Sequence, residues 1–232
     1  MSDDDFASRV SRLAALAEPA RRALYRFVAS QSEPVSRDRA SEGVGLPRHT
    51  AKFHLDRLVE EGLLVTEFRR LTGRTGPGAG RPTKLYRRAP QSVSVSVPER
   101  RYDLAGDLMA RAIEESATRG TDVSAVLNRT AAEYGATLGA GVADAAGADA
   151  EGAARLDGVC ASLESLGYEP RVDGDVVTLV NCPFHALARQ HTELVCGMNL
   201  ALLTGMADRA WPEVTATLDP APERCCVTLA GG

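Results

Sequence analysis

Cysteine is absent from the first 159 residues of this 232-residue chain, and all five cysteines lie in its last third. Long apolar runs are absent as well, because no segment approaches the roughly 18 uninterrupted apolar residues of a membrane-spanning helix. The first residues also lack the basic and then apolar order of a signal peptide. We therefore expect a cytoplasmic chain without a membrane partner. Cysteines are normally reduced in the cytosol, so a cluster of them there indicates metal binding or redox chemistry.

Charge is unevenly distributed along the chain, although the net charge of the whole is only −4. Residues 1–101 carry 19 Lys and Arg against 12 Asp and Glu, a net charge of +7. Residues 102–232 carry 8 against 19, a net charge of −11. A basic half joined to an acidic half is typical of a nucleic-acid-binding module followed by a regulatory module.

The basic half contains a series of short helical patterns. Apolar spacing predicts helices over Val10–Ala17, Ala20–Ser30 and Arg37–Glu42, with Ser36 as the N-cap of the third. A fourth helix follows and is closed by Gly62. Its apolar stripe consists of Ala51, Leu55, Leu58 and Val59. Two helices joined by a short Gly-containing turn predict a helix-turn-helix motif.

The phrase His54-Leu55-x-x-Leu58-x-x-x-Gly62-Leu63 resembles the recognition helix of winged helix-turn-helix repressors of the ArsR type. Two strand-like segments follow it, Leu64–Leu71 and Lys84–Arg88, on either side of a Gly-rich tip. The Gly-Arg-Pro and Leu-Tyr-Arg phrases in this region strengthen the resemblance, which covers roughly residues 8–90. The resemblance implies a winged helix-turn-helix DNA-binding domain over residues 1–90.

A recognition helix enters the major groove by its N-terminal turns, and a wing can reach the backbone or the minor groove. His54 is expected to support helix packing instead of contacting DNA. The candidate DNA-binding residues are Arg48, His49, Thr50 and Lys52 on the helix, and Arg69, Arg70, Arg74, Arg81 and Lys84 on the wing. We expect double-stranded DNA as the partner. Since groove readers usually dimerise to match palindromic sites, we also expect a homodimer on a palindromic operator.

Pro90 and Pro98 flank an alternating Ser and Val segment, which predicts a linker over residues 91–100. Residues 101–232 mix helical and strand patterns, and they predict an α+β sensor and dimerisation domain; the fold class of the chain is therefore α+β. The expected helices are Asp103–Thr118, Val123–Leu138, Ala153–Leu166 and Phe184–Met206. The expected strands are Tyr168–Val172 and Asp175–Val180, joined by an Asp173-Gly174 turn, and Arg224–Ala230.

Cys182 and Cys196 can share a site only if the helix between them is interrupted. A continuous helix would separate them by about 21 Å at 1.5 Å per residue. His191-Thr192-Glu193 offers the interruption, because Thr192 suits an N-cap and Glu193 suits a first helical turn.

Cys225 and Cys226 are adjacent in an expected strand, where neighbouring side chains face opposite sides. Cys225 shares its face with Val227 and Leu229, so we expect it to be the ligand and Cys226 the spare. Cys160 lies at helical spacing from leucines and is expected to be a small core residue.

The Cys-x13-Cys-x28-Cys arrangement, which begins with Cys-Pro-Phe, is similar to the C-terminal region of SufR-like repressors of iron–sulfur cluster assembly. This resemblance implies an iron–sulfur cluster (4Fe-4S or 2Fe-2S) held by Cys182, Cys196 and Cys225. His185, on the same helical face as Cys182, is the candidate fourth ligand, and His191 is the next. Because three thiolates and a histidine also suit zinc, the alternatives are zinc, a metal-free thiol switch and structural cysteines.

The sequence thus predicts a DNA-binding transcriptional regulator whose operator binding is controlled by an iron–sulfur cluster. The alternative is a winged-helix regulator with a structural or metal-sensing zinc site and a helix-lined pocket for an apolar effector. An enzyme with a cysteine nucleophile is not expected, since no orienting group or oxyanion motif accompanies the cysteines.

Overall fold

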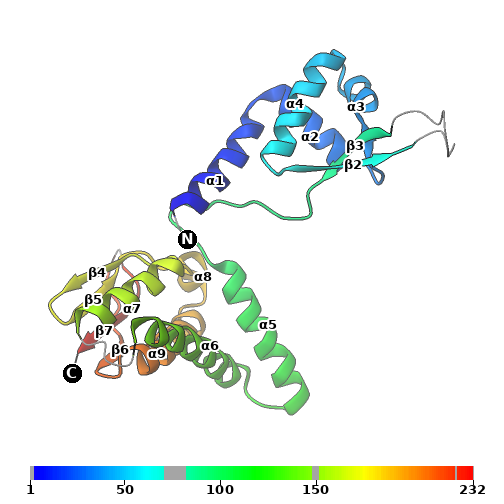
Figure 1. Cartoon of the computed structure of the whole chain (residues 1–232). Coiled ribbons are helices and arrows are strands. Elements are labelled where there is room, and N and C mark those ends of the chain that lie inside the picture. The colour runs from blue at the N-terminus through cyan, green and yellow to red at the C-terminus, as the bar shows by residue number, and fades with distance from the viewer. Residues whose placement is uncertain (1–2, 71–81, 148–151, 223, 232) are drawn as a thin grey trace. The chain divides into compact units, whose positions relative to one another are not determined.

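The computed structural model describes residues 3–70, 82–147, 152–222 and 224–231 of a mixed helix and sheet fold (Figure 1). The chain divides into two compact units, Ser2–Val95 and Ser96–Gly232. The division falls inside the segment 91–100.

The N-terminal unit consists of helices followed by a small antiparallel sheet. Its helices are α1 (Asp3–Ala14), α2 (Pro19–Ala29), α3 (Arg37–Val44) and α4 (Arg48–Glu60), and a 3-10 turn over Ala15–Ala17 joins the first two. Its strands are β1 (Val35–Ser36), β2 (Leu64–Arg69) and β3 (Thr83–Arg88), in the order β1-β3-β2.

Local chemistry fixes the ends of α2 and α3. The Glu18 carboxylate accepts hydrogen bonds from the first backbone N–H groups of α2, and Pro19 occupies its first position. The N-cap predicted at Ser36 is confirmed, because its hydroxyl accepts a hydrogen bond from the Arg39 backbone N–H. Gly45 ends α3 at a positive φ of 68°, and Gly45–Pro47 then forms the turn into α4.

Within its described residues, the C-terminal unit combines five helices with a four-stranded antiparallel sheet. The helices are α5 (Tyr102–Arg119), α6 (Val123–Ala146), α7 (Ala153–Ser165), α8 (His185–Gln190) and α9 (Thr192–Ala210). The strands are β4 (Pro170–Asp173), β5 (Val176–Leu179), β6 (Val214–Leu218) and β7 (Val227–Gly231), in the order β4-β5-β7-β6. α9 lies at the centre, because it buries residues around its whole circumference.

Several elements differ from the sequence expectation, among them α1, which begins at Asp3 and not at Val10, and the short strand β1, which was not expected. α6 continues to Ala146 instead of ending near Leu138. The β4–β5 hairpin turns at Gly174 and Asp175, one residue later than expected, because Asp173 pairs with Val176 and Gly174 takes the positive φ of 58°. β6 was not expected, and its five residues follow Trp211, where α9 ends.

Across the described ranges, no helix is long and apolar enough to cross a bilayer.

Candidate nucleic-acid interface and thiol site

α4 separates a buried face from an exposed face. Ala51, Leu55 and Leu58 are buried in the apolar core of the N-terminal unit, and His54 is buried beside them. On the opposite face Arg48, His49 and Lys52 are exposed, while Thr50 is half-buried. The outer face of α4 thus presents the basic side chains that the sequence predicted there.

The hairpin formed by β2 and β3 is tied to α4 by an ion-pair network. The Lys84 ammonium donates a hydrogen bond of 2.7 Å to Asp56 Oδ1, and the Tyr86 hydroxyl donates one of 3.2 Å to the same oxygen. Lys52 Nζ lies 3.3 Å from Asp56 Oδ2. Partial burial opposes ionisation of Asp56, but the hydrogen bonds from Lys84, Lys52 and Tyr86 outweigh burial and lower the pKa of the carboxyl group. Asp56 therefore holds two candidate DNA-binding lysines next to one another.

The candidate arginines that the structure describes lie at the surface. Arg48 pairs with Asp38 at 3.4 Å, and Arg69 donates a hydrogen bond of 2.6 Å to Glu67. Arg70 is exposed, whereas Arg74 and Arg81 lie outside the described residues. Exposed ion pairs of this kind contribute only about 0–1 kcal/mol, so phosphate groups can displace the acidic partners.

In the C-terminal unit a break between two helices precedes Cys196. α8 ends at Gln190 and α9 begins at Thr192, so the break predicted near His191 is confirmed. The N-cap is His191 and not Thr192, because the Thr192 hydroxyl instead donates a hydrogen bond of 2.8 Å to the Ala188 carbonyl oxygen of the preceding helix.

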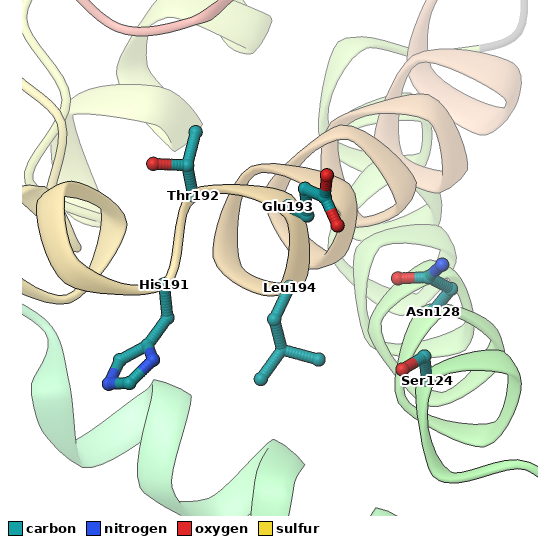
Figure 2. Close-up of a pocket in the computed structure, with 6 residues that line it drawn as sticks. All are labelled: Ser124, Asn128, His191, Thr192, Glu193 and Leu194. Atoms are coloured by element: carbon teal, nitrogen blue, oxygen red, sulfur yellow. The ribbon is translucent and has the colours of Figure 1, made fainter.

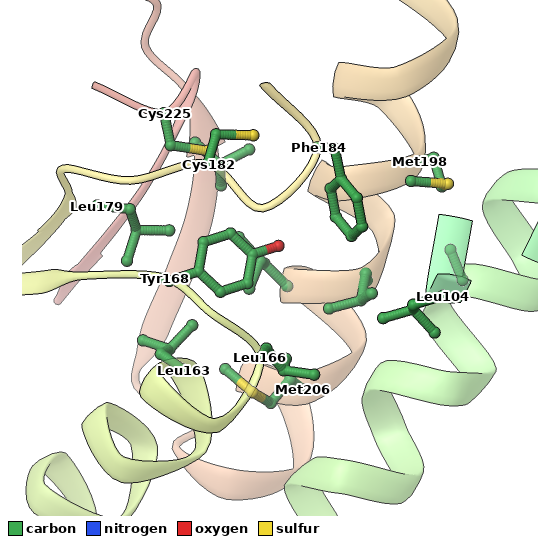
Figure 3. Packing of buried hydrophobic residues seen from close by; sticks show 14 of the residues in the cluster. Leu104, Leu163, Leu166, Tyr168, Leu179, Cys182, Phe184, Met198, Met206 and Cys225 are labelled. Atoms are coloured by element: carbon green, nitrogen blue, oxygen red, sulfur yellow. The ribbon is translucent and has the colours of Figure 1, made fainter. Parts of the chain in front are cut away.

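Four thiols from three separate segments meet at the end of the sheet. Cys182 precedes α8, Cys196 lies in α9, and Cys225 and Cys226 precede β7. The Cys182 and Cys226 thiols both hydrogen-bond to Cys225, and Cys226 also contacts Cys196. Figure 3 shows Cys182 beside Cys225 at the edge of the apolar core. We refer to these four residues as the thiol cluster.

The thiol cluster has an asymmetric charge distribution. Hydrogen bonds from Cys182 and Cys226, together with one from Asn199, lower the pKa of Cys225 despite its burial. The same bonds raise the pKa of Cys182 and of Cys226, since each donates its proton to Cys225. The arrangement therefore favours one thiolate, at Cys225, among protonated neighbours.

Cys226 belongs to the cluster, whereas the sequence made it the spare cysteine. The strand expected from Arg224 begins only at Val227, and Cys226 lies in a bend before it. Side-chain alternation applies to extended strands, so it does not separate Cys225 from Cys226 here. Cys160 is half-buried in α7. Burial and the nearby carboxylates of Glu164 and Asp157 raise the pKa of its thiol.

The two histidines considered as the fourth ligand are exposed. His185 is the first residue of α8, and His191 lies at the helix break. The thiol contacts described above include neither of them. In the part of the chain that the structure describes, no three His, Cys, Asp or Glu side chains already surround a position for a single metal ion. The thiols instead form a row of pairwise contacts that runs in space from Cys182 through Cys225 and Cys226 to Cys196.

Asn199 connects the thiol cluster to the core. Its amide donates a hydrogen bond of 3.2 Å to Cys225 Sγ, and its carbonyl oxygen accepts one from the Tyr168 hydroxyl. Both Asn199 and Tyr168 are buried. Burial raises the pKa of Tyr168, so its hydroxyl stays protonated and remains a donor.

Comparison with known families found a match in the N-terminal unit. Residues 16–67 match the model of a helix-turn-helix domain. The matched segment includes α2, α3 and α4, and thus the exposed basic face described above. The match supports a DNA-binding transcriptional regulator. Searches of curated proteins and of solved structures gave no match.

The chain that leaves the helix-turn-helix domain is held against the segment that carries Cys182. The Arg100 guanidinium donates hydrogen bonds to Asn181 Oδ1 and, at 3.1 Å, to the Cys182 carbonyl oxygen. The Asn181 amide in turn donates to the carbonyl oxygens of Glu99, at 3.1 Å, and Gly167, at 2.6 Å. We call the contacts of Arg100 and Asn181 the clasp. It joins the start of the C-terminal unit directly to a residue of the thiol cluster.

Two hollows of the C-terminal unit bear on the small-molecule alternative. The pocket at the helix break is lined by five polar residues and one leucine (Figure 2), namely Ser124, Asn128, His191, Thr192, Glu193 and Leu194. A groove between α6 and α7 is more apolar, and its lining includes Leu138, Val142, Ala145 and Ala161. The groove is the better fit to an apolar effector.

Proposed function

We propose that this chain is a winged, ArsR-like transcriptional regulator whose operator binding is controlled by an iron–sulfur cluster, as the similarity to SufR-like repressors implies. The observation that carries the proposal is the meeting of four thiols from distant segments at one place in the C-terminal unit. We propose Cys182, Cys196 and Cys225 as ligands. Cys226 replaces His185 as the fourth, because Cys226 contacts two of the other thiols while His185 is exposed.

The donor set fits a soft metal centre. Thiolates are the ligands of iron–sulfur clusters and also of structural zinc. Ligation requires deprotonated sulfur, so it would replace the thiol–thiol hydrogen bonds and release their protons. When bound, the cluster would supply sensitivity to iron supply and to oxidants, which is the chemistry the regulator needs.

The clasp is the proposed connection between the thiol cluster and the helix-turn-helix domain. Ligation at Cys182 would hold the Asn181–Pro183 segment, and through it Glu99 and Arg100, in one conformation. Loss of the cluster would free this segment and with it the residues that lead into the DNA-binding unit. In a homodimer on a palindromic operator, such a change alters the spacing of the two recognition helices and therefore the affinity for DNA.

The first experiment is iron, acid-labile sulfide and zinc analysis of full-length protein purified without oxygen. We expect iron and sulfide in similar amounts, a brown colour, and operator affinity that changes when the cluster is removed. Zinc without sulfide would support the alternative of a zinc site. A protein that contains neither metal and binds DNA equally well before and after oxidation contradicts the proposal.

Single substitutions then test the ligand set. We expect Cys182→Ser, Cys196→Ser, Cys225→Ser and Cys226→Ser to lose most of the iron, whereas His185→Ala and Cys160→Ser retain it. The matched pair is Cys226→Ser and His185→Ala, because the two residues compete for the fourth position. Retention of iron in Cys226→Ser together with its loss in His185→Ala would reverse the assignment.

A further inference from the structure

Phe53 is an exposed aromatic residue in the middle of α4. It is 65% exposed, although its neighbour His54 is buried on the inner face of the helix. The two rings meet edge to face, with centroids 5.3 Å apart. Phe53 does not belong to the apolar core of the N-terminal unit. Burying such a side chain would stabilise the protein by about 1.5–3 kcal/mol, and Phe53 in its exposed position contributes little of this.

The surface around Phe53 is polar. His49 lies one helical turn before it, Lys52 immediately precedes it, and Arg57 lies one turn after it. These three residues line one shallow hollow of the helix surface together with Phe53 and Asp56. An apolar ring therefore stands among the groups that are suited to phosphates and to the polar edges of bases.

The major groove contains one matching apolar group. The edges of adenine, guanine and cytosine present hydrogen-bond donors and acceptors, whereas thymine adds a 5-methyl group that apolar side chains, including Phe, contact. Recognition helices read bases from their first turns, and Phe53 is in the second turn of α4 on the same outward face as His49 and Lys52.

We infer that Phe53 is a specificity-determining residue that recognises thymine through contact between its ring and the 5-methyl group. The inference rests on the proposed DNA-binding function. It assigns a T·A pair to each half of the operator, at the position that faces the middle of α4.

Deoxyuridine tests this contact, because it differs from thymidine only by the missing methyl group. Binding sites would first be selected from random duplexes with the full chain at one fixed salt concentration. Each thymine of the selected site would then be replaced by deoxyuridine. At one position per half-site we expect a loss of affinity of about three- to fivefold, which corresponds to one buried methyl group.

Variants identify the residue that makes the contact. Phe53→Ser should bind the thymine site more weakly and be indifferent to deoxyuridine at that position, while Phe53→Leu, which stays apolar, should keep the penalty. Phe68→Ser is the matched control, since Phe68 is 66% exposed and lies on β2 of the hairpin; this variant should keep the full penalty.

The possible failures are distinguishable. An unchanged deoxyuridine penalty in Phe53→Ser, or specific binding without a penalty at any thymine, would overturn the role of Phe53 and leave DNA binding intact. A chain that binds no duplex at all would overturn the proposed function as well.

Discussion

Asn199 illustrates how one buried residue sets the chemistry of the thiol cluster. A side-chain amide offers both hydrogen-bond donors and an acceptor. Asn199 donates to the Cys225 sulfur and accepts from the Tyr168 hydroxyl. A hydrogen bond to a charged group contributes about 1.5–3 kcal/mol, more than one between neutral groups. Asn199 therefore favours the thiolate form of Cys225, while its carbonyl oxygen is bound separately by the Tyr168 hydroxyl.

Replacement of Asn199 by Leu should raise the pKa of Cys225, because the thiolate loses a donor while its burial is unchanged. A pH titration of the thiolate ultraviolet absorbance of the reduced, metal-free chain measures this change. The first thiolate should appear at higher pH than in the parent protein. Loss of a hydrogen bond to a metal-binding side chain typically weakens metal binding about 10–100-fold, so zinc affinity should fall as well.

Tyr168→Phe is the control for that substitution. It removes the hydroxyl bound to the Asn199 carbonyl oxygen and keeps the Asn199 amide group that donates to Cys225. We expect a titration close to that of the parent protein. If the first thiolate appears at the same higher pH in both variants, core packing, and not the hydrogen bond to sulfur, controls the pKa of Cys225.

At the scale of elements, the contact between α6 and α9 positions Cys196. The two helices approach so closely that a Cβ at Gly135 would overlap the carbonyl oxygen of Leu202, and one at Gly205 would overlap that of Ala132. Backbone atoms cannot move aside as a side chain can. The glycines thus set the distance between the two helices, and with it the place of Cys196 beside the sheet.

Gly135→Ala should therefore destabilise the C-terminal unit, by about 1–3 kcal/mol or more, which is the usual cost of overpacking. Urea unfolding followed by tryptophan fluorescence reports on this unit specifically. The single tryptophan of the chain is Trp211, which packs against the C-terminal core.

Gly141→Ala, in the same helix, provides the comparison. A Cβ at Gly141 meets nothing within 4 Å, so alanine there should stabilise the helix by up to about 1 kcal/mol. Opposite effects of the two substitutions are expected. Similar effects would mean that helix propensity, and not the α6–α9 contact, determines the outcome.

The elements also show what could be predicted from the sequence. Apolar periodicity and caps predicted most helices and the break at His191, because these depend on neighbouring residues. The role of Cys226 could not be predicted in this way, since it depends on a bend at Cys226 itself, after which strand β7 begins at Val227. The clasp was missed for a related reason: Arg100 and Asn181 are 81 positions apart in sequence and meet only in the folded chain.

At the scale of the whole molecule, residues 91–100 connect the two halves of opposite charge, so this segment is a direct route by which the C-terminal unit can control DNA binding. The clasp is the point at which the thiol cluster meets this segment, and it lies entirely within the C-terminal unit. Allosteric coupling between two sites typically changes affinity about 5–150-fold. We expect the clasp to determine the size of this change, which is the ratio of the operator affinities measured with and without the metal centre.

Arg100→Ala should reduce that ratio toward one while the protein still takes up metal and still binds DNA, because neither the thiols nor α4 are altered. Operator affinity would be measured by anisotropy for loaded and metal-free protein at one salt concentration. Arg101→Ala is the matched control. The Arg101 side chain pairs with Asp103 and reaches the Ser165 carbonyl oxygen, but its link to Pro183 is made by its backbone N–H, which alanine keeps. If Arg100→Ala retains the full ratio, or if Arg101→Ala loses it equally, coupling does not pass through the Arg100 guanidinium, and another connection between the units has to carry it.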